Sequence, residues 1–128
     1  MKIITVLILL ILLSALSGCL SSDKSQADII GPRENSEAGI KITVTYLPDV
    51  IDATAFDIKV TSHMDYNDAF ANISYLRDSS GNTYKPLSYE GSGGHHASGI
   101  LRFAKIEGNR FELIIQDVAG VKERVFKW

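Results

Sequence analysis

The sequence has very little cysteine. The chain has one cysteine, so no disulfide can form within it and the fold must be held by packing and hydrogen bonds. Net charge is also small and negative, −2 at pH 7, which gives no general attraction for phosphate backbones. We therefore expect no nucleic-acid partner. At 128 residues the chain is also too short for two domains of ordinary size, about 100 to 200 residues each.

Sequence signatures of catalysis are missing as well. There is no H-E-x-x-H or paired C-x-x-C spacing for a metal enzyme and no G-x-S-x-G turn for a hydrolase. The glycines between residues 91 and 99 lack the Lys-Ser/Thr of a phosphate-binding loop and do not open a helical pattern. We therefore predict that the chain is not an enzyme.

A long apolar run stands at the N-terminus, from residue 3 to residue 13. Lys2 precedes the run and small residues follow it, which is the order of an export signal. A permanent transmembrane helix needs about 20 predominantly apolar residues, and Ser14 interrupts the run before it reaches that length. Residues 1–18 are therefore predicted to be a signal peptide.

The stretch Leu16-Ser17-Gly18-Cys19 resembles the lipobox of prokaryotic lipoproteins, with the single cysteine of the chain at its end. The resemblance implies that Cys19 becomes the lipidated first residue; an ordinary secretory signal with an incidental cysteine is the alternative. Residues 19–38 are polar and read as the lipidated cysteine followed by a flexible tether. We therefore expect an exported protein, held by the Cys19 lipid on the outer face of the cytoplasmic membrane or in the cell envelope.

From residue 39 onward, apolar and polar residues alternate in short runs, as in half-buried strands. Turn residues separate the runs, and Gly81 suits the positive φ of a hairpin loop. No stretch of helical period is long enough for a helix of ordinary length. Residues 39–128 are therefore predicted to form an all-β fold, an immunoglobulin-like antiparallel β-sandwich of about seven strands, with an open barrel as the alternative.

All three histidines fall in two segments of this domain, at His63 and at His95-His96 within the glycine-rich residues 91–99, which we expect to form a loop. Imidazole nitrogens with a carboxylate such as Asp65 suit Cu or Zn, so His63 with His95 or His96 is a candidate metal site. Adjacent histidines point to opposite sides of an extended chain, so only one of the pair is expected to join His63. The alternative is a structural role, in which a histidine hydrogen-bonds to backbone carbonyls of the loop.

Two further surface features are expected. Asn72-Ile73-Ser74 is a glycosylation sequon, and the alternation of residues 71–75 places Ala71 and Ile73 inward and Asn72 outward. Tyr66, Tyr84 and Tyr89 lie near the histidine segments. They are expected either to form an aromatic recognition patch for a protein or a glycan, or to cover the end of the sandwich.

From about residue 56 to the C-terminus the chain resembles a largely uncharacterised family of exported prokaryotic lipoproteins. The element Gly93-Gly94-His95-His96 carries the resemblance most specifically, together with residues 61–63, 76–86 and 117–128. The resemblance implies a single immunoglobulin-like sandwich and an extracytoplasmic location. The expected function is a lipid-anchored binding or structural module, and the alternative is a metal-handling lipoprotein.

Overall fold

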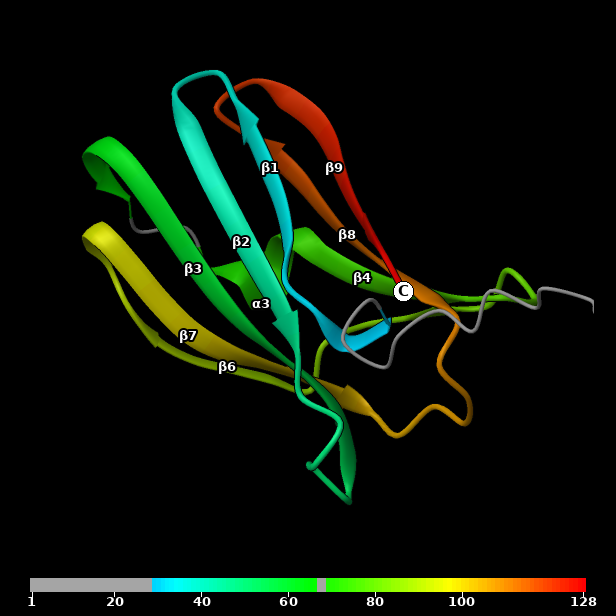
Figure 1. The fold of residues 1–128 in the computed structure, drawn as a ribbon. Coiled ribbons are helices and arrows are strands. Elements are labelled where there is room, and N and C mark those ends of the chain that lie inside the picture. Colours follow the sequence, from blue (N-terminus) through cyan, green and yellow to red (C-terminus); the bar gives the residue numbers. More distant parts are fainter. Residues whose placement is uncertain (1–28, 67–68) are drawn as a thin grey trace, which may run out of the picture.

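The computed structural model describes residues 29–66 and 69–128, so Cys19, the signal segment and most of the expected tether lie outside the described residues. The described part is a sandwich of two antiparallel sheets (Figure 1). One sheet has the strand order β1-β2-β3-β7-β6 and the other β5-β4-β8-β9. The bounds are β1 Arg33–Glu37, β2 Ile40–Tyr46, β3 Ala53–Tyr66, α3 Phe70–Ile73, β4 Ser74–Asp78, β5 Thr83–Tyr84, β6 Ser88–Ser92, β7 Gly94–Ala104, β8 Phe111–Val118 and β9 Val121–Lys127.

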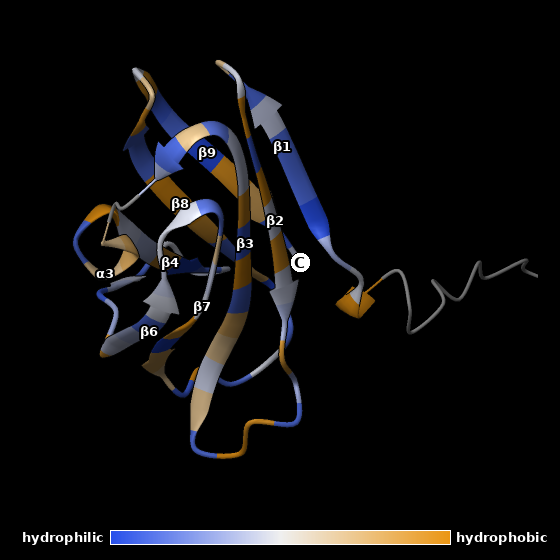
Figure 2. Cartoon of the chain, turned by 90° about the vertical axis from the view of Figure 1, so that its left-hand side faces the viewer, coloured by the Kyte–Doolittle hydropathy of each residue, from blue (hydrophilic) through white to orange (hydrophobic). Residues whose placement is uncertain are grey.

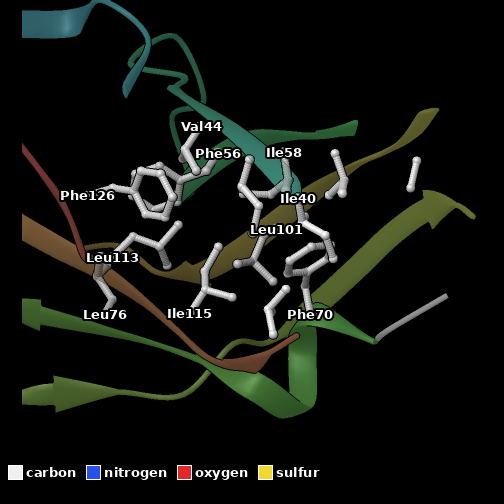
Figure 3. Close-up of a cluster of buried hydrophobic side chains, with 14 of the residues drawn as sticks. Ile40, Val44, Phe56, Ile58, Phe70, Leu76, Leu101, Leu113, Ile115 and Phe126 are labelled. Atoms are coloured by element: carbon white, nitrogen blue, oxygen red, sulfur yellow. The ribbon is translucent and has the colours of Figure 1, made fainter. Parts of the chain in front are cut away.

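The sandwich prediction is confirmed, because two antiparallel sheets pack together and the apolar sets of the expected runs in β2 and β3 are buried between them. Ile42 and Val44 of β2 are 0% exposed, and so are Phe56 and Ile58 of β3. Figure 2 shows the alternation as bands of opposite hydropathy along β2 and β3. The side chains of both sheets meet in one core (Figure 3), whose labelled members are Ile40, Val44, Phe56, Ile58, Phe70, Leu76, Leu101, Leu113, Ile115 and Phe126.

The described residues contain nine strands rather than about seven, and one of the additional strands lies inside the expected tether. Strand β1 covers Arg33–Glu37 and pairs with β2 along its length, from Arg33 opposite Val44 to Glu37 opposite Ile40. Its sequence is wholly polar, as its blue colour in Figure 2 shows. Hydrogen bonds hold this edge strand in place and no hydrophobic side chain of its own does, so hydrophobic alternation gave no signal for it.

The predicted strand at residues 71–75 is wrong in its first half. Residues Phe70–Ile73 form the short helix α3, and β4 begins at Ser74. The residues of β4 that face inward are Ser74 and Leu76, which are 7% and 0% exposed. The set of inward-facing residues is therefore displaced by one position from the predicted set, which included Ile73. The reason is Phe70, which is 1% exposed: its ring lies in the core and the chain must turn around it before β4 starts.

The predicted glycine-rich loop at residues 91–99 is instead the β6–β7 hairpin, with Gly91 paired opposite Gly99. Both glycines lie against the ring of Tyr89. A Cβ on Gly91 would lie 2.5 Å from the Tyr89 hydroxyl oxygen, and a Cβ on Gly99 would lie 2.6 Å from the ring. These two glycines therefore let an aromatic ring lie flat on two neighbouring strands, which a side chain at either position would prevent.

The predicted hairpin turn between β4 and β5 is confirmed. Gly81 has φ +87°, and the N–H of Asp78 donates to the carbonyl oxygen of Asn82 over 3.0 Å. The Asp78 carboxylate fixes the turn by accepting from the N–H groups of Ser80 and Asn82, each over 2.9 Å. It also accepts from the Tyr84 hydroxyl over 2.9 Å. These hydrogen bonds, that of the Asn82 side chain above all, hold the pKa of Asp78 below its usual range.

Candidate functional site

The strand directions give the sandwich two distinct ends. At one, which we call the terminal end, Arg33 at the start of β1 donates from Nε to the carbonyl oxygen of Lys127 at the end of β9, over 2.8 Å. At the other, the hairpin end, lie the β1–β2 turn, the β8–β9 turn and the tip of the β6–β7 hairpin (Figure 1). The chain preceding residue 33 therefore enters the domain beside its C-terminus, at the end opposite the hairpin tips.

The predicted histidine segments meet at the hairpin end. His96 pairs opposite Thr61, whereas Gly94 pairs opposite Tyr66, so residues 62–65 of β3 form an irregular bulge beside His95. The bulge places His63 and Asp65 at the surface next to β7. The β3–β7 pairing therefore brings the two histidine segments side by side, and metal binding there stays a prediction.

The closest approach between the candidate metal ligands is 3.4 Å, from Nε2 of His95 to Oδ1 of Asp65. Both side chains are exposed, by 59% and 71%. Within residues 29–66 and 69–128 no group of three or more His, Cys, Asp or Glu side chains is arranged to hold a metal ion. An exposed pair of this kind forms an ion pair when the imidazole is protonated, and such pairs contribute about 0 to 1 kcal/mol.

The three tyrosines do not gather in one aromatic patch, because Tyr66 and Tyr89 pack against Phe70 whereas Tyr84 lies in the β4–β5 hairpin. Tyr66 is 7% exposed, and its ring centroid lies 5.8 Å from that of Phe70. The Tyr89 ring meets Phe70 edge-on at 5.3 Å. Tyr84 points its hydroxyl to Asp78 in the β4–β5 turn. The covering role expected for these residues therefore fits Tyr66 and Tyr89 but not Tyr84, and recognition of a protein or a glycan stays a prediction.

Asn72, the sequon residue, is exposed as predicted, although it lies in α3 rather than on a strand. Its backbone N–H donates to the carbonyl oxygen of Ala69 over 2.9 Å. Asn72 borders an open hollow of about 700 Å³ that also touches Tyr75 and Gln116. Glycosylation of Asn72 stays a prediction.

The sequence analysis missed a second feature, an open groove of about 900 Å³ at the terminal end. Its floor includes a row of charged side chains from three neighbouring strands, in which Arg77 of β4 pairs opposite Glu112 of β8, and Glu112 opposite Lys127 of β9. Glu112 accepts from Arg77 Nε over 2.8 Å and from Lys127 Nζ over 2.9 Å. The hydrogen bond from Lys127 and that from Arg77 lower the pKa of Glu112 and keep it ionised.

Comparisons with protein-family models, with curated proteins and with solved structures found no match. The resemblance to a lipoprotein family therefore stays a prediction. Among the described residues, no helix has the length and apolar character needed to cross a membrane.

Proposed function

We propose that this chain is an exported lipoprotein, anchored through Cys19, whose sandwich acts as a non-catalytic binding or structural module outside the cytoplasmic membrane. The lipobox-like residues 16–19 and the preceding signal pattern support the anchor. The observation that carries the proposal is the position of Arg33 beside Lys127, because it brings the chain from Cys19 into the domain at the terminal end.

This entry point orients the domain relative to the membrane. The residues from Cys19 to Ile29 extend over at most roughly 35 Å, so the terminal end stays close to the bilayer. The hairpin end, with His63, Asp65, His95 and the 75%-exposed Met64, then faces away from it. The proposed module therefore presents the hairpin end to its partner, which we propose to be a protein or a glycan of the envelope.

Mass spectrometry of the native protein tests the anchor directly. The expected product begins at Cys19 and carries a lipid adduct. Cys19→Ser should remain unprocessed and without lipid, whereas the neighbouring control Ser22→Ala should be processed like the wild type. A wild-type protein that reaches the envelope with an unmodified Cys19 would refute the anchor.

A second candidate function is the binding of Cu or Zn at the hairpin end, and the 3.4 Å approach of His95 to Asp65 favours it. His63 lies on the same bulge and supplies a third donor if its side chain turns toward the pair. His96 follows His95 on an extended strand and so points to the opposite face, which makes it the matched control.

Calorimetric titration with Cu²⁺ and Zn²⁺ separates this function from the first. A metal site predicts tight binding that His63→Ala and His95→Ala abolish and His96→Ala retains. Binding should also weaken as the pH falls, because the imidazoles take up protons. If neither ion binds tightly to the wild-type chain, the metal function is excluded.

A further inference from the structure

The outer face of the sheet formed by β5, β4, β8 and β9 carries a fully buried aliphatic side chain. Ile114 of β8 is 0% exposed, yet its neighbours Leu113 and Ile115 are the ones that lie in the core between the sheets. Side chains alternate along a strand, so Ile114 lies on the outer face. Other side chains on this face must therefore cover it.

Tyr75 lies across this position. It pairs from β4 directly opposite Ile114, and its hydroxyl donates to Oε1 of Glu123 on β9 over 3.3 Å. Because β8 lies between β4 and β9, the Tyr75 side chain must cross β8 to reach Glu123. The ring therefore lies along the sheet over Ile114 and does not stand away from it. Burial and the Glu123 carboxylate raise the pKa of Tyr75, so its hydroxyl stays protonated as the donor.

The Tyr75 ring borders the open hollow of about 700 Å³ that Asn72 also touches. Tyr75 is half-buried, so the ring face turned away from Ile114 is open to this hollow. Polar side chains from three other elements complete the lining, Asn72 of α3, Thr83 of β5 and Gln116 of β8. Asn72 and Thr83 are exposed and accessible to a ligand.

The chemistry of the lining is mostly that of uncharged groups. No acidic side chain of the described residues lines the hollow, and Arg77, which does, is held by Glu112. Lys85 is exposed and adds one further donor. A sugar ring presents C–H groups on its faces, which pack on an aromatic ring, and hydroxyl groups at its rim, which pair with amides. A fixed aromatic ring beside two amides therefore fits a neutral sugar.

We propose that this hollow binds a neutral glycan, with the Tyr75 ring as the platform for one sugar and the amides of Asn72 and Gln116 as partners of its hydroxyl groups. Because the ring lies along the sheet, the site favours the extended chain of β-linked sugars over the curved chain of α-linked sugars. The proposal rests on the binding-module function proposed above and names its ligand class. Gln116 lies near the end of β8 at the hairpin end, the end that the proposed anchor turns away from the bilayer.

Calorimetric titration of the full chain with cellotetraose and chitotetraose tests the site. The protein is produced in a host without asparagine-linked glycosylation, which keeps Asn72 unmodified, and is kept in a detergent without a sugar headgroup. We expect saturable binding of at least one of these β-linked probes and weaker binding of the α-linked maltotetraose. If neither β-linked probe binds saturably, the glycan site is refuted. If maltotetraose binds as tightly as they do, the preference for an extended chain is wrong.

Two matched pairs of variants test the residues. Tyr75→Ala should weaken binding at least about tenfold, as expected for an aromatic residue at the centre of a contact, whereas Tyr75→Phe keeps the ring and should bind like the wild type. Asn72→Ala should weaken binding about two- to tenfold, because it removes a hydrogen-bonding amide. Asn109→Ala makes the same change at an exposed asparagine outside the lining and should bind like the wild type.

Thermal unfolding of each variant verifies its fold. Tyr75→Ala uncovers Ile114 and is the variant most exposed to a loss of stability, but Asn72→Ala changes an exposed side chain and keeps the test valid. If Asn72→Ala binds like Asn109→Ala, the hollow is not the site. If Tyr75→Phe loses binding as fully as Tyr75→Ala, the ring is not the platform.

The outcomes also separate this site from the anchor. Absence of glycan binding by a protein whose Cys19 carries a lipid refutes the site and leaves the anchored module with another partner. An unmodified Cys19 refutes the anchor and leaves the titrations unaffected.

Discussion

Nη1 of Arg124 on β9 lies 2.6 Å from Oδ1 of Asn35 on β1, to which it donates a hydrogen bond across the gap between the two sheets. Arg124 is 1% exposed, and it also donates to backbone carbonyl oxygens, among them those of Glu37 at 2.9 Å and Ile40 at 3.1 Å. One buried cation therefore joins the edge of the first sheet to the second, and within residues 29–66 and 69–128 it forms hydrogen bonds to amide and carbonyl oxygens and no ion pair with a carboxylate.

Asn35→Ala should lower the free energy of unfolding by about 1.5 to 3 kcal/mol, because hydrogen bonds to charged groups are worth that much. Asn35→Asp keeps the acceptor and adds a counter-charge, so it should be at least as stable as the wild type. Urea unfolding of the three proteins measures the difference. A loss below about 0.5 kcal/mol for Asn35→Ala would show that the contact does not stabilise the fold.

Gly99→Ala should destabilise the domain by about 1 to 3 kcal/mol, because the added methyl group overlaps the Tyr89 ring. The neighbouring exposed position provides the control, since Ser98→Ala should have little effect. In a double-mutant cycle, the Gly99→Ala cost should shrink when Tyr89 is also alanine. Additive costs in that cycle would mean that the ring is not what requires glycine.

The depressed pKa of Glu112 predicts a dependence of stability on pH. Because its folded-state pKa lies below the ordinary value of 4.5, Glu112 stabilises the fold above pH 4.5, and this contribution is lost as the pH falls through the folded-state pKa. Glu112→Gln should reduce the fall in unfolding free energy between about pH 5 and pH 2. Glu107→Gln, an exposed change outside the groove lining, is the control. Equal acid profiles for the wild type and Glu112→Gln would contradict the prediction.

Phe111→Ala should cost about 3 to 5 kcal/mol, the range for removing a buried aromatic ring. Phe111 is 3% exposed and packs edge-on against Tyr46 and Phe56, with ring centroids at 5.0 and 5.7 Å. Its centroid also lies 5.8 Å from that of Trp128, so tryptophan fluorescence reports both the local change and global unfolding. A cost near 1 kcal/mol would indicate that the surrounding rings close the space.

The strands that could be predicted from the sequence are those in which alternating apolar side chains must be buried. Alternation located β2 and the core half of β3, because Ile42 and Phe56 must leave water whatever the neighbouring strand is. Alternation failed at β1, where backbone pairing rather than side-chain burial makes the strand. It also failed before β4, where Phe70 is buried through a helical turn.

The candidate sites divide in the same way. The sequence placed the histidine segments near the ends of two strand-like runs, and the β3–β7 pairing does bring these segments side by side. The groove at the terminal end could not. Arg77, Glu112 and Lys127 are far apart in the sequence and become neighbours only through the β4–β8–β9 register. The packing of the half-buried Tyr89 ring against Gly91 and Gly99 was likewise unpredictable, because it depends on the β6–β7 pairing that puts the two glycines opposite each other.

The attachment of the chain through β1 has a mechanical consequence. Strand β1 starts at the terminal end and runs toward the hairpin end, antiparallel to β2. Tension on an anchor at Cys19 would therefore pull β1 along its own axis. The force would act on all the β1–β2 backbone hydrogen bonds at once and would not break them one after another. Arg124 also donates hydrogen bonds to Asn35 and Glu37 in the second half of the strand. Detachment of β1 must therefore break these hydrogen bonds to a buried guanidinium group as well. If the chain is anchored through Cys19 as proposed, this polar strand, which adds nothing to the hydrophobic core, is suited to resist shear.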